Sequence, residues 1–398
     1  MNRPLSNNWL WRLIARLAFN RVDVVGKERI PASGPILFVA THRNGALDAA
    51  PYSLAVPAAM PMVSAQLHRL PLGRFLFQGI AVARTKDRNR GIEANNTEAT
   101  RHCIDLLKGD GQLFIMPEGT STLGHAHLPY HRGAARILHA ALGTGVRPAI
   151  VPLAVHYEDP TVWQSRAEVV VGEPIFPQAS DDVATLHQHI TRGLESVGAN
   201  FASAEAQRRA EMLAYASTLG TPTPYARALK NFEQAMPDAL VTIVRELEQI
   251  SQRERLCLHQ GVPLTPLGPW LLYALYWMLL APFVAAFAAL NAPVLLAGHV
   301  ASRKLPDDAN VIAFWRMVAA LPVALLWLVV ANALLLLACG MAAVVSYWLL
   351  TAVGLAAWYR FRKLSVALCN RLLHRSARPA LLGAYRKLMD WMTHEKIA

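Results

Sequence analysis

The sequence predicts an α/β domain, in which helices cover a sheet, followed by an all-α transmembrane region. From about residue 22 to residue 171, short apolar runs alternate with segments of helical periodicity, as in a sheet whose strands are connected by helices. Two later stretches, 256–302 and 317–359, contain no Asp, Glu, Lys or Arg, and runs of that length are typical of membrane segments. The chain is 54% hydrophobic and only 17% charged, whereas soluble domains carry roughly 25% charged residues.

The formal net charge of +12 predicts an anionic partner. Membrane headgroups and a phosphorylated substrate fit this charge better than nucleic acid, because no basic stretch interleaved with aromatic residues is present. The four cysteines are scattered without metal-type spacing, so we expect reduced thiols in a protein that faces the cytosol.

Residues 1–21 are predicted to form an amphipathic interfacial helix. Trp9, Leu13 and Phe19 alternate with Arg12 and Arg16, so the segment lacks the clean apolar core of a cleavable signal peptide. Such a helix can lie in the membrane interface with its arginines at headgroup level. The alternative is a helix that packs on its own domain.

Periodicity and turn residues define the elements of a domain over 22–200 and of a helical linker region over 201–260. An apolar run at 76–83 leads to Arg84, and a helix starts near Ala49. In the linker region, 225–255 is an amphipathic helix pair broken near Pro237. The predicted strands are 22–25, 36–40, 60–65, 112–116, 149–156 and 167–171, and the other predicted helices are 93–107, 133–142, 181–199 and 203–217.

Residues 261–359 are predicted to form the membrane region. A single helix over 317–359 would be about 65 Å long, twice the bilayer core, so this stretch is predicted to be a hairpin that turns at Gly340. The tail, 360–398, carries nine Lys or Arg against two acids, which places it in the cytoplasm by the positive-inside rule. Residues 267–297 must then enter and leave on one side, as a re-entrant segment or a second hairpin.

The candidate chemistry begins directly after the predicted strand 36–40, where His42 and Asp48 follow on a turn of small residues. A histidine held by a carboxylate can take a proton from a hydroxyl at neutral pH, although a lone histidine at a strand end is more often structural. Arg84 follows a second apolar run and suits a phosphate group, with Lys86 and Arg88 as supplements.

Two further stretches complete a pattern: Pro117-Glu118-Gly119-Thr120 directly follows one strand, and Pro152 lies within another. In this order, the four stretches resemble the sequence blocks of the phospholipid/glycerol acyltransferase family over about residues 22–180. The resemblance implies a glycerolipid acyltransferase-type sheet and the transfer of a fatty acyl group from a thioester to a glycerol phosphate or a lysophospholipid.

The resemblance also implies residue roles. His42 and Asp48 would be catalytic, as general base and as the group that orients it. The substrate-binding residues would be Arg84, Glu118, Gly119, Thr120 and Pro152, although Glu118 could instead only brace its turn. No cofactor is expected, since acyl-coenzyme A or acyl carrier protein brings an activated acyl group as co-substrate.

Two departures from the family pattern concern the acceptor. Five residues separate His42 from Asp48 instead of the usual four, a variant found in a branch that resembles glycerol-3-phosphate acyltransferases with C-terminal membrane helices. Ser121 stands where an arginine commonly follows the Glu-Gly-Thr turn, and Arg132 is a candidate replacement.

The resulting hypothesis is an integral membrane acyltransferase of phospholipid biosynthesis with its catalytic domain in the cytoplasm, at a bacterial inner membrane or its equivalent. The acceptor would be glycerol 3-phosphate or 1-acylglycerol 3-phosphate. The alternatives are a lysophospholipid-remodelling enzyme for another headgroup and an inactive membrane scaffold or lipid-binding relative. His125, His127 and His131 lie close in sequence without an adjacent carboxylate or thiolate, so we expect no metal site there.

Overall fold

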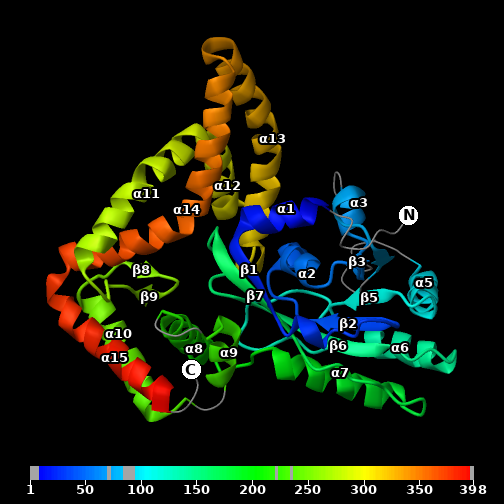
Figure 1. Cartoon of the computed structure of the whole chain (residues 1–398). Coiled ribbons are helices and arrows are strands. Elements are labelled where there is room, and N and C mark those ends of the chain that lie inside the picture. The colour runs from blue at the N-terminus through cyan, green and yellow to red at the C-terminus, as the bar shows by residue number, and fades with distance from the viewer. Residues whose placement is uncertain (1–8, 70–72, 84–94, 220–222, 234–235, 395–398) are drawn as a thin grey trace. The chain divides into compact units, whose positions relative to one another are not determined.

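The computed structural model describes residues 9–69, 73–83, 95–219, 223–233 and 236–394. The chain divides into two compact units: unit 1 is Met1–Tyr157 with Arg166–Ala202, and unit 2 is Glu158–Ser165 with Ser203–Ala398. Unit 1 contains a seven-stranded sheet with helices, and unit 2 is mostly helical (Figure 1). This architecture confirms the predicted fold class.

The sheet of unit 1 has the strand order β1-β7-β6-β2-β5-β3-β4. Strand β2 lies at its centre, pairs in parallel with β5 and β6, and is buried along its whole length because neighbours cover both edges and both faces. Strand β7 runs antiparallel to β6. The strands are β1 Phe19–Val25, β2 Ile36–Ala40, β3 Met60–Ser64, β4 Ile80–Val82, β5 Gln112–Ile115, β6 Ala149–Tyr157 and β7 Ser165–Val171.

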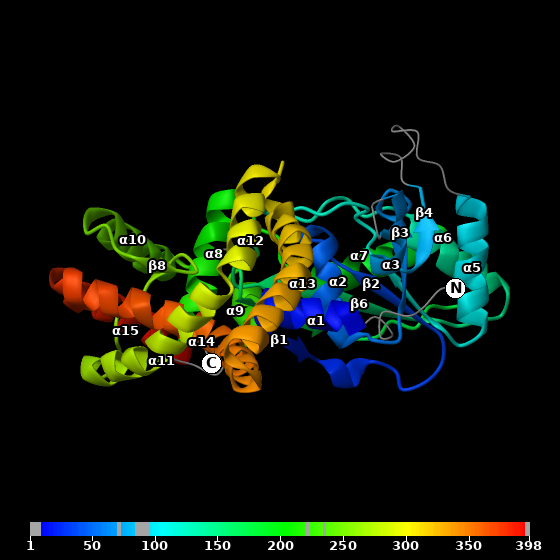
Figure 2. The same cartoon turned by 90° about the horizontal axis from the view of Figure 1, so that it is seen from above.

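Helices lie on both faces of this sheet, with α2 on one side and α6 and α7 on the other (Figures 1 and 2). The core between the sheet and α5, α6 and α7 is built mainly from Leu, Ile, Val and Ala side chains. The predicted apolar run 76–83 is split into α3 and β4 at Gly79, whose φ is 157°. A Cβ there would lie 2.3 Å from the Pro61 carbonyl oxygen, so only glycine fits. The helices are α1 Trp9–Ala18, α2 Ala49–Ala55, α3 Gly73–Leu76, α5 Asn96–Lys108, α6 Gly133–Gly143 and α7 Val183–Val197.

Helix α1 packs one face on its own unit, against α2 and β1. Leu10, Trp11 and Ile14 are buried, whereas Trp9 is 64% exposed and Leu13 38% exposed. The buried face matches the alternative of a helix packed on its own domain. An interfacial role for the exposed face stays a prediction.

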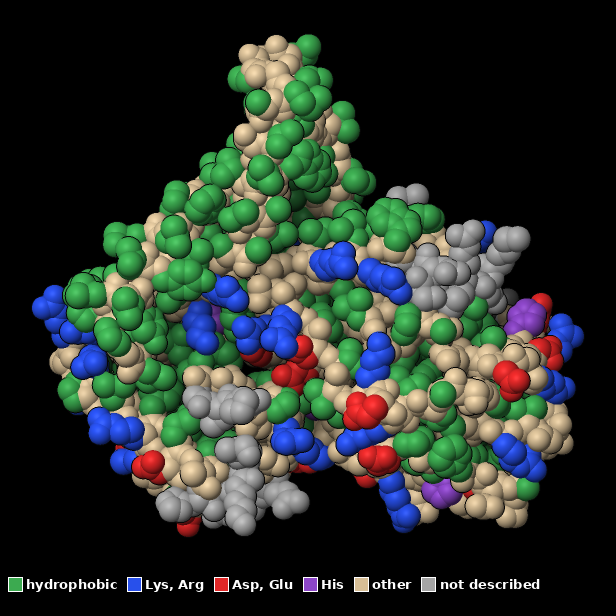
Figure 3. All heavy atoms as spheres, in the orientation of Figure 1, with side chains coloured by type: hydrophobic (Ala, Val, Ile, Leu, Met, Phe, Trp, Pro, Cys, Tyr) green, Lys and Arg blue, Asp and Glu red, His purple; other side chains and the backbone are tan. Residues whose placement is uncertain are grey.

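Among the described residues of unit 2, three helical segments are long and apolar enough to cross a membrane: Trp270–Leu290, Ala309–Cys339 and Met341–Leu373. Gly340, with φ 80°, separates the last two, and Figure 3 shows hydrophobic side chains over this helical pair. The elements are α8 Ala204–Ser217, α9 Tyr225–Asn231, α10 Asp238–Arg253, β8 Leu258–His259, β9 Val262–Pro263, α11 Trp270–Leu290, α12 Ala292–Lys304, α13 Ile312–Cys339, α14 Met341–Leu373 and α15 Arg378–His394.

The stretch predicted as a re-entrant segment or hairpin is divided at Asn291 into α11 and α12. Helix α11 packs along α14, where a Cβ on Gly354 would lie 2.3 Å from the Phe287 Cβ, and α12 packs along α13. At 13 residues, α12 is about 20 Å long, shorter than the bilayer core. That residues 267–297 enter and leave on the same side stays a prediction.

Candidate active site

The site forms where β2 and β5 end at the same edge of the sheet. Val39 of β2 is in register with Ile115 of β5, so the turn that carries His42 and the turn that begins at Pro117 leave the sheet side by side. The backbone N–H of Thr122 donates a hydrogen bond to the His42 carbonyl oxygen, 3.1 Å away, which joins the two turns. Two of the predicted sequence blocks therefore meet at this edge.

His42 and Asp48 are in direct contact despite the five residues between them. His42 Nδ1 lies 2.9 Å from Asp48 Oδ2. The intervening turn includes Gly45 at φ 54° and continues as a single 3-10 turn into α2. Because Nδ1–H donates to the carboxylate, Nε2 is the nitrogen of this imidazole that can accept a proton from a substrate.

Asp48 is fully buried, and its carboxylate accepts hydrogen bonds from four groups. Besides His42, the donors to Oδ2 are the backbone N–H groups of Arg43 at 2.7 Å and Asn44 at 3.0 Å. Oδ1 accepts from the Asn44 N–H and from the Tyr157 hydroxyl. A buried charge persists only when it is paired and hydrogen-bonded, and these donors meet that condition.

Tyr157 is a site residue that sequence reasoning missed. It is the last residue of β6, one position beyond the predicted end of that strand, and its ring stacks on Phe19 at 5.6 Å between centroids. Burial and the nearby Asp48 charge raise the pKa of Tyr157 well above its ordinary value, so its hydroxyl remains a donor. Its position in the sequence could have indicated this role, because β6 pairs in parallel with β2 and therefore ends at the same edge of the sheet as the turn that carries His42.

Glu118 braces the two turns from inside the protein. It is 2% exposed, and its Oε1 accepts the His42 N–H at 2.8 Å while its Oε2 accepts the Leu128 N–H at 3.1 Å. His127 Nδ1 lies 3.5 Å from Oε1. Both carboxylate oxygens are thus engaged by the protein itself, which favours the bracing alternative over contact with a substrate.

The other predicted substrate-binding residues fall into three groups. Gly119, with φ 68°, and Thr120 line a cleft next to His42; a Cβ on Gly119 would lie 3.1 Å from the His131 ring. Pro152 lies in the buried strand β6. Gly172 and Gly193 pack so closely against its ring that a Cβ on either would contact it, so Pro152 belongs to the core. It lines neither this cleft nor the apolar cavity that contains His42. Arg84 lies outside the described residues, as do Lys86 and Arg88.

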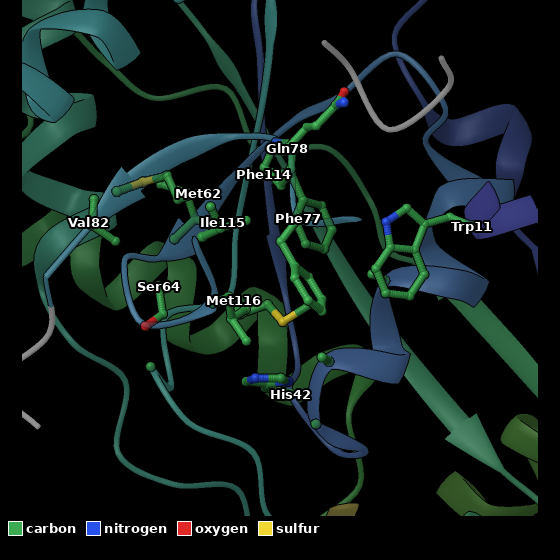
Figure 4. Close-up of a pocket in the computed structure, with 17 residues that line it drawn as sticks. Trp11, His42, Met62, Ser64, Phe77, Gln78, Val82, Phe114, Ile115 and Met116 are labelled. Atoms are coloured by element: carbon green, nitrogen blue, oxygen red, sulfur yellow. The ribbon is translucent and has the colours of Figure 1, made fainter. Parts of the chain in front are cut away.

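Two adjoining hollows differ in their chemistry. An apolar cavity of ≈ 200 Å³ has His42 at its edge and is lined mostly by apolar side chains, such as those of Trp11, Met62 and Phe77 (Figure 4). A larger cleft of ≈ 790 Å³ shares Met116 and Gly119 with the first and adds polar and basic groups. Those groups are Asn96, Thr100, Thr120, His131, Arg132 and Arg136, and Glu118 also lines the cleft.

The three clustered histidines of the sequence separate in the fold. His127 is buried beside Glu118, with its side chain 5% exposed, whereas His125 and His131 are exposed. Within the part of the chain that the structure describes, no three His, Cys, Asp or Glu side chains come together as a metal site requires.

Comparison with known proteins identifies this unit. Residues 21–156 match the family model described as Acyltransferase. Unit 1 thus contains an acyltransferase domain. The match confirms the resemblance drawn from the four sequence blocks, over most of the span expected for it.

The crystal structure of the 1-acyl-sn-glycerophosphate (LPA) acyltransferase PlsC from Thermotoga maritima aligns with a TM-score of 0.34 and 21% sequence identity. The alignment covers 49% of this chain and 82% of that one. Among curated proteins, none matches the chain.

Proposed function

We propose that this acyltransferase is a membrane-bound enzyme of phospholipid biosynthesis. It moves a fatty acyl group from acyl-coenzyme A or acyl carrier protein to a hydroxyl of glycerol 3-phosphate or 1-acylglycerol 3-phosphate. The observation that carries the proposal is the His42–Asp48 pair, in contact at 2.9 Å, with His42 at the edge of an apolar cavity. A base beside such a cavity suits attack by a hydroxyl on the carbonyl at the head of a fatty chain.

In the proposed reaction, Nε2 of His42 takes the proton from the acceptor hydroxyl as its oxygen attacks the thioester carbonyl carbon. Asp48 keeps the proton of the neutral imidazole on Nδ1, and its charge stabilises the imidazolium that forms. When the tetrahedral intermediate collapses, the carbon–sulfur bond breaks and the imidazolium returns the proton to the leaving thiolate. Because the thioester is already activated, this route requires no acyl-enzyme intermediate and no cofactor.

The apolar cavity and the polar cleft suit different parts of the substrates. The apolar cavity suits the acyl chain, whose transfer out of water is favourable. The cleft offers the guanidinium groups of Arg132 and Arg136 and the hydroxyl of Thr120, which are phosphate-binding groups. Arg84 remains a proposed phosphate ligand on sequence grounds.

The apolar helices of unit 2 support a location in the membrane, where the acylated products belong. The basic tail, with nine Lys or Arg after residue 359, supports a cytoplasmic orientation of the chain's C-terminal part and of the catalytic domain. A bacterial inner membrane or its equivalent would then give the site access to a soluble donor and a lipid acceptor.

An acceptor panel tests the proposal with the full chain in phospholipid vesicles. Glycerol 3-phosphate, 1-acylglycerol 3-phosphate and a neutral lysolipid are each offered with acyl-coenzyme A and with acyl carrier protein as donor. We expect product from a phosphorylated glycerol acceptor and a loss of about 100-fold or more in His42→Ala. Product from the neutral lysolipid alone would favour the remodelling enzyme, and full turnover in His42→Ala would refute the base assignment.

A further inference from the structure

Unit 2 brings together two of the four cysteines of the chain. Cys257 lies between α10 and β8, and Cys369 lies near the end of α14. Their Sγ atoms are 3.1 Å apart, although 112 positions separate them in the sequence. A disulfide has a sulfur–sulfur length of about 2.0 Å, so the two thiols need to approach by only about 1 Å more.

Asn370 holds this contact in place. Its Oδ1 accepts the Cys257 N–H at 2.8 Å, and its Nδ2 donates to the carbonyl oxygens of Cys257 at 2.9 Å and Leu264 at 2.8 Å. Asn370 is 2% exposed and follows Cys369 directly, so both backbone groups of Cys257 are fixed beside α14. The proximity of the two thiols is therefore built into the packing of unit 2.

Small reagents can reach the pair. Both cysteines are half-buried rather than enclosed. Cys369 lies ten residues beyond the last position of the uncharged stretch 317–359, which is about 15 Å along a helix, and Arg360, Arg362 and Lys363 come between. The thiols thus lie beyond the uncharged stretch, at the charged end of α14.

We propose that Cys257 and Cys369 form a reversible disulfide, a redox modification site that links α14 to the segment before the β8–β9 hairpin. The oxidant is a low-molecular-weight disulfide. One cysteine thiolate attacks it and releases the first small thiolate; the second cysteine thiolate then attacks the mixed disulfide and releases the other. The two protons lost by the cysteines end on the two released thiols, and the two electrons that reduce the small disulfide come from the two cysteine sulfurs, which are oxidised as they form the protein disulfide.

The remaining cysteines serve as internal controls because neither has this arrangement. Cys103 is fully buried, and burial raises its pKa to about 12, which keeps it a protonated and unreactive thiol. Cys339 is exposed at the end of α13, next to Gly340. In a reducing compartment Cys257 and Cys369 remain free thiols, as the sequence predicts for a protein that faces the cytosol. The disulfide forms when the ratio of small disulfides to small thiols rises.

Intact-mass measurement of the full chain in lipid nanodiscs tests the proposal. After exposure to oxidised glutathione, we expect the loss of two hydrogen atoms and a proteolytic fragment pair joined through Cys257 and Cys369. A thiol reductant should restore the original mass. The variant with Cys103→Ser and Cys339→Ser should behave the same way, and Cys257→Ser should not lose the two hydrogens.

Two results would overturn the proposal. One is a chain that keeps all four thiols free at every ratio of oxidised to reduced glutathione. The other is a chain that gains only a glutathionyl adduct, since that would show that the second thiol cannot reach the mixed disulfide. Neither readout depends on acyl transfer, so the test stands apart from the proposed function.

Discussion

Replacing Tyr157 with phenylalanine removes one hydroxyl that donates a hydrogen bond to the Asp48 carboxylate, which we propose takes part in catalysis. In the native protein this hydroxyl donates to Asp48 Oδ1, inside a fully buried pocket. Without it, Oδ1 keeps only the Asn44 N–H at 3.0 Å, while Oδ2 keeps His42 Nδ1 and two backbone donors. The dyad should therefore persist in a less restrained and less stabilised form.

The expected magnitude follows from the kind of hydrogen bond that is lost. A hydrogen bond to a charged group contributes about 1.5–3 kcal/mol. Only the part of this energy that differs between the ground state and the transition state affects turnover, so we expect kcat to fall about 10-fold with KM unchanged.

Tyr52→Phe is the matched control for this experiment. Tyr52 is also a fully buried tyrosine near Asp48, but its hydroxyl donates to the Thr41 carbonyl oxygen at 2.9 Å and not to the carboxylate. Tyr157→Phe loses one buried hydrogen bond to a carboxylate, whereas Tyr52→Phe loses the bond to the Thr41 carbonyl oxygen and the 3.2 Å bond with Thr41 Oγ1, so both should lose about 1–3 kcal/mol of unfolding free energy. Steady-state kinetics and thermal unfolding of both variants separate a catalytic effect from a structural one.

Equal losses of kcat in the two variants would contradict a role for Tyr157 in the reaction, since the effect would then be general destabilisation. A native kcat in Tyr157→Phe would contradict it as well. A fall in kcat at unchanged KM in Tyr157→Phe, with a native kcat in Tyr52→Phe, would identify Tyr157 as a positioning residue that acts through Asp48.

Three further predictions test other parts of the site and fold. Glu118→Gln places an amide N–H₂ against the His42 or Leu128 N–H, so thermal unfolding should show a loss of about 1–3 kcal/mol, together with a lower kcat; unchanged unfolding would contradict the bracing role. Arg84→Ala should raise KM for a phosphorylated acceptor far more than KM for the acyl donor, and equal effects in initial-rate kinetics would remove the phosphate role. Cys103, whose pKa burial raises to about 12, carries almost no thiolate at pH 8 and should take up maleimide, followed by mass spectrometry, only after denaturation; labelling of the folded chain would contradict its burial.

The parts of the fold that sequence could predict are those fixed by short-range patterns. The strand at 36–40 reads as an uninterrupted apolar run between turn residues because both neighbours and both faces bury it, and β2 occupies those residues. The break between α13 and α14 falls at Gly340 because that position needs a positive φ, which glycine adopts without strain. The need for glycine at position 79 depends instead on the Pro61 carbonyl oxygen, which approaches from β3, a strand that lies elsewhere in the sequence.

The contacts of the site depended on tertiary proximity and could be predicted only in part. The motif placed His42 beside Asp48, but nothing in the local sequence shows that Tyr157 reaches the same carboxylate from a position 109 residues away. For Glu118 the sequence allows both contact with a substrate and bracing of the turn, because a carboxylate on a turn is compatible with either role. Its burial and its two backbone donors, which only the fold supplies, favour bracing.

The spacing between His42 and Asp48 carries less information about the acceptor than the sequence suggested. The carboxylate is fixed mainly by the backbone N–H groups of Arg43 and Asn44, which lie at the start of the same turn. An additional residue can therefore be accommodated in the 3-10 turn at Gly45, without moving the imidazole, as long as those two N–H groups still point at Asp48. The choice of acceptor should then depend on the groups that line the cleft, such as Arg132 and Thr120, because these are the side chains that a headgroup would contact.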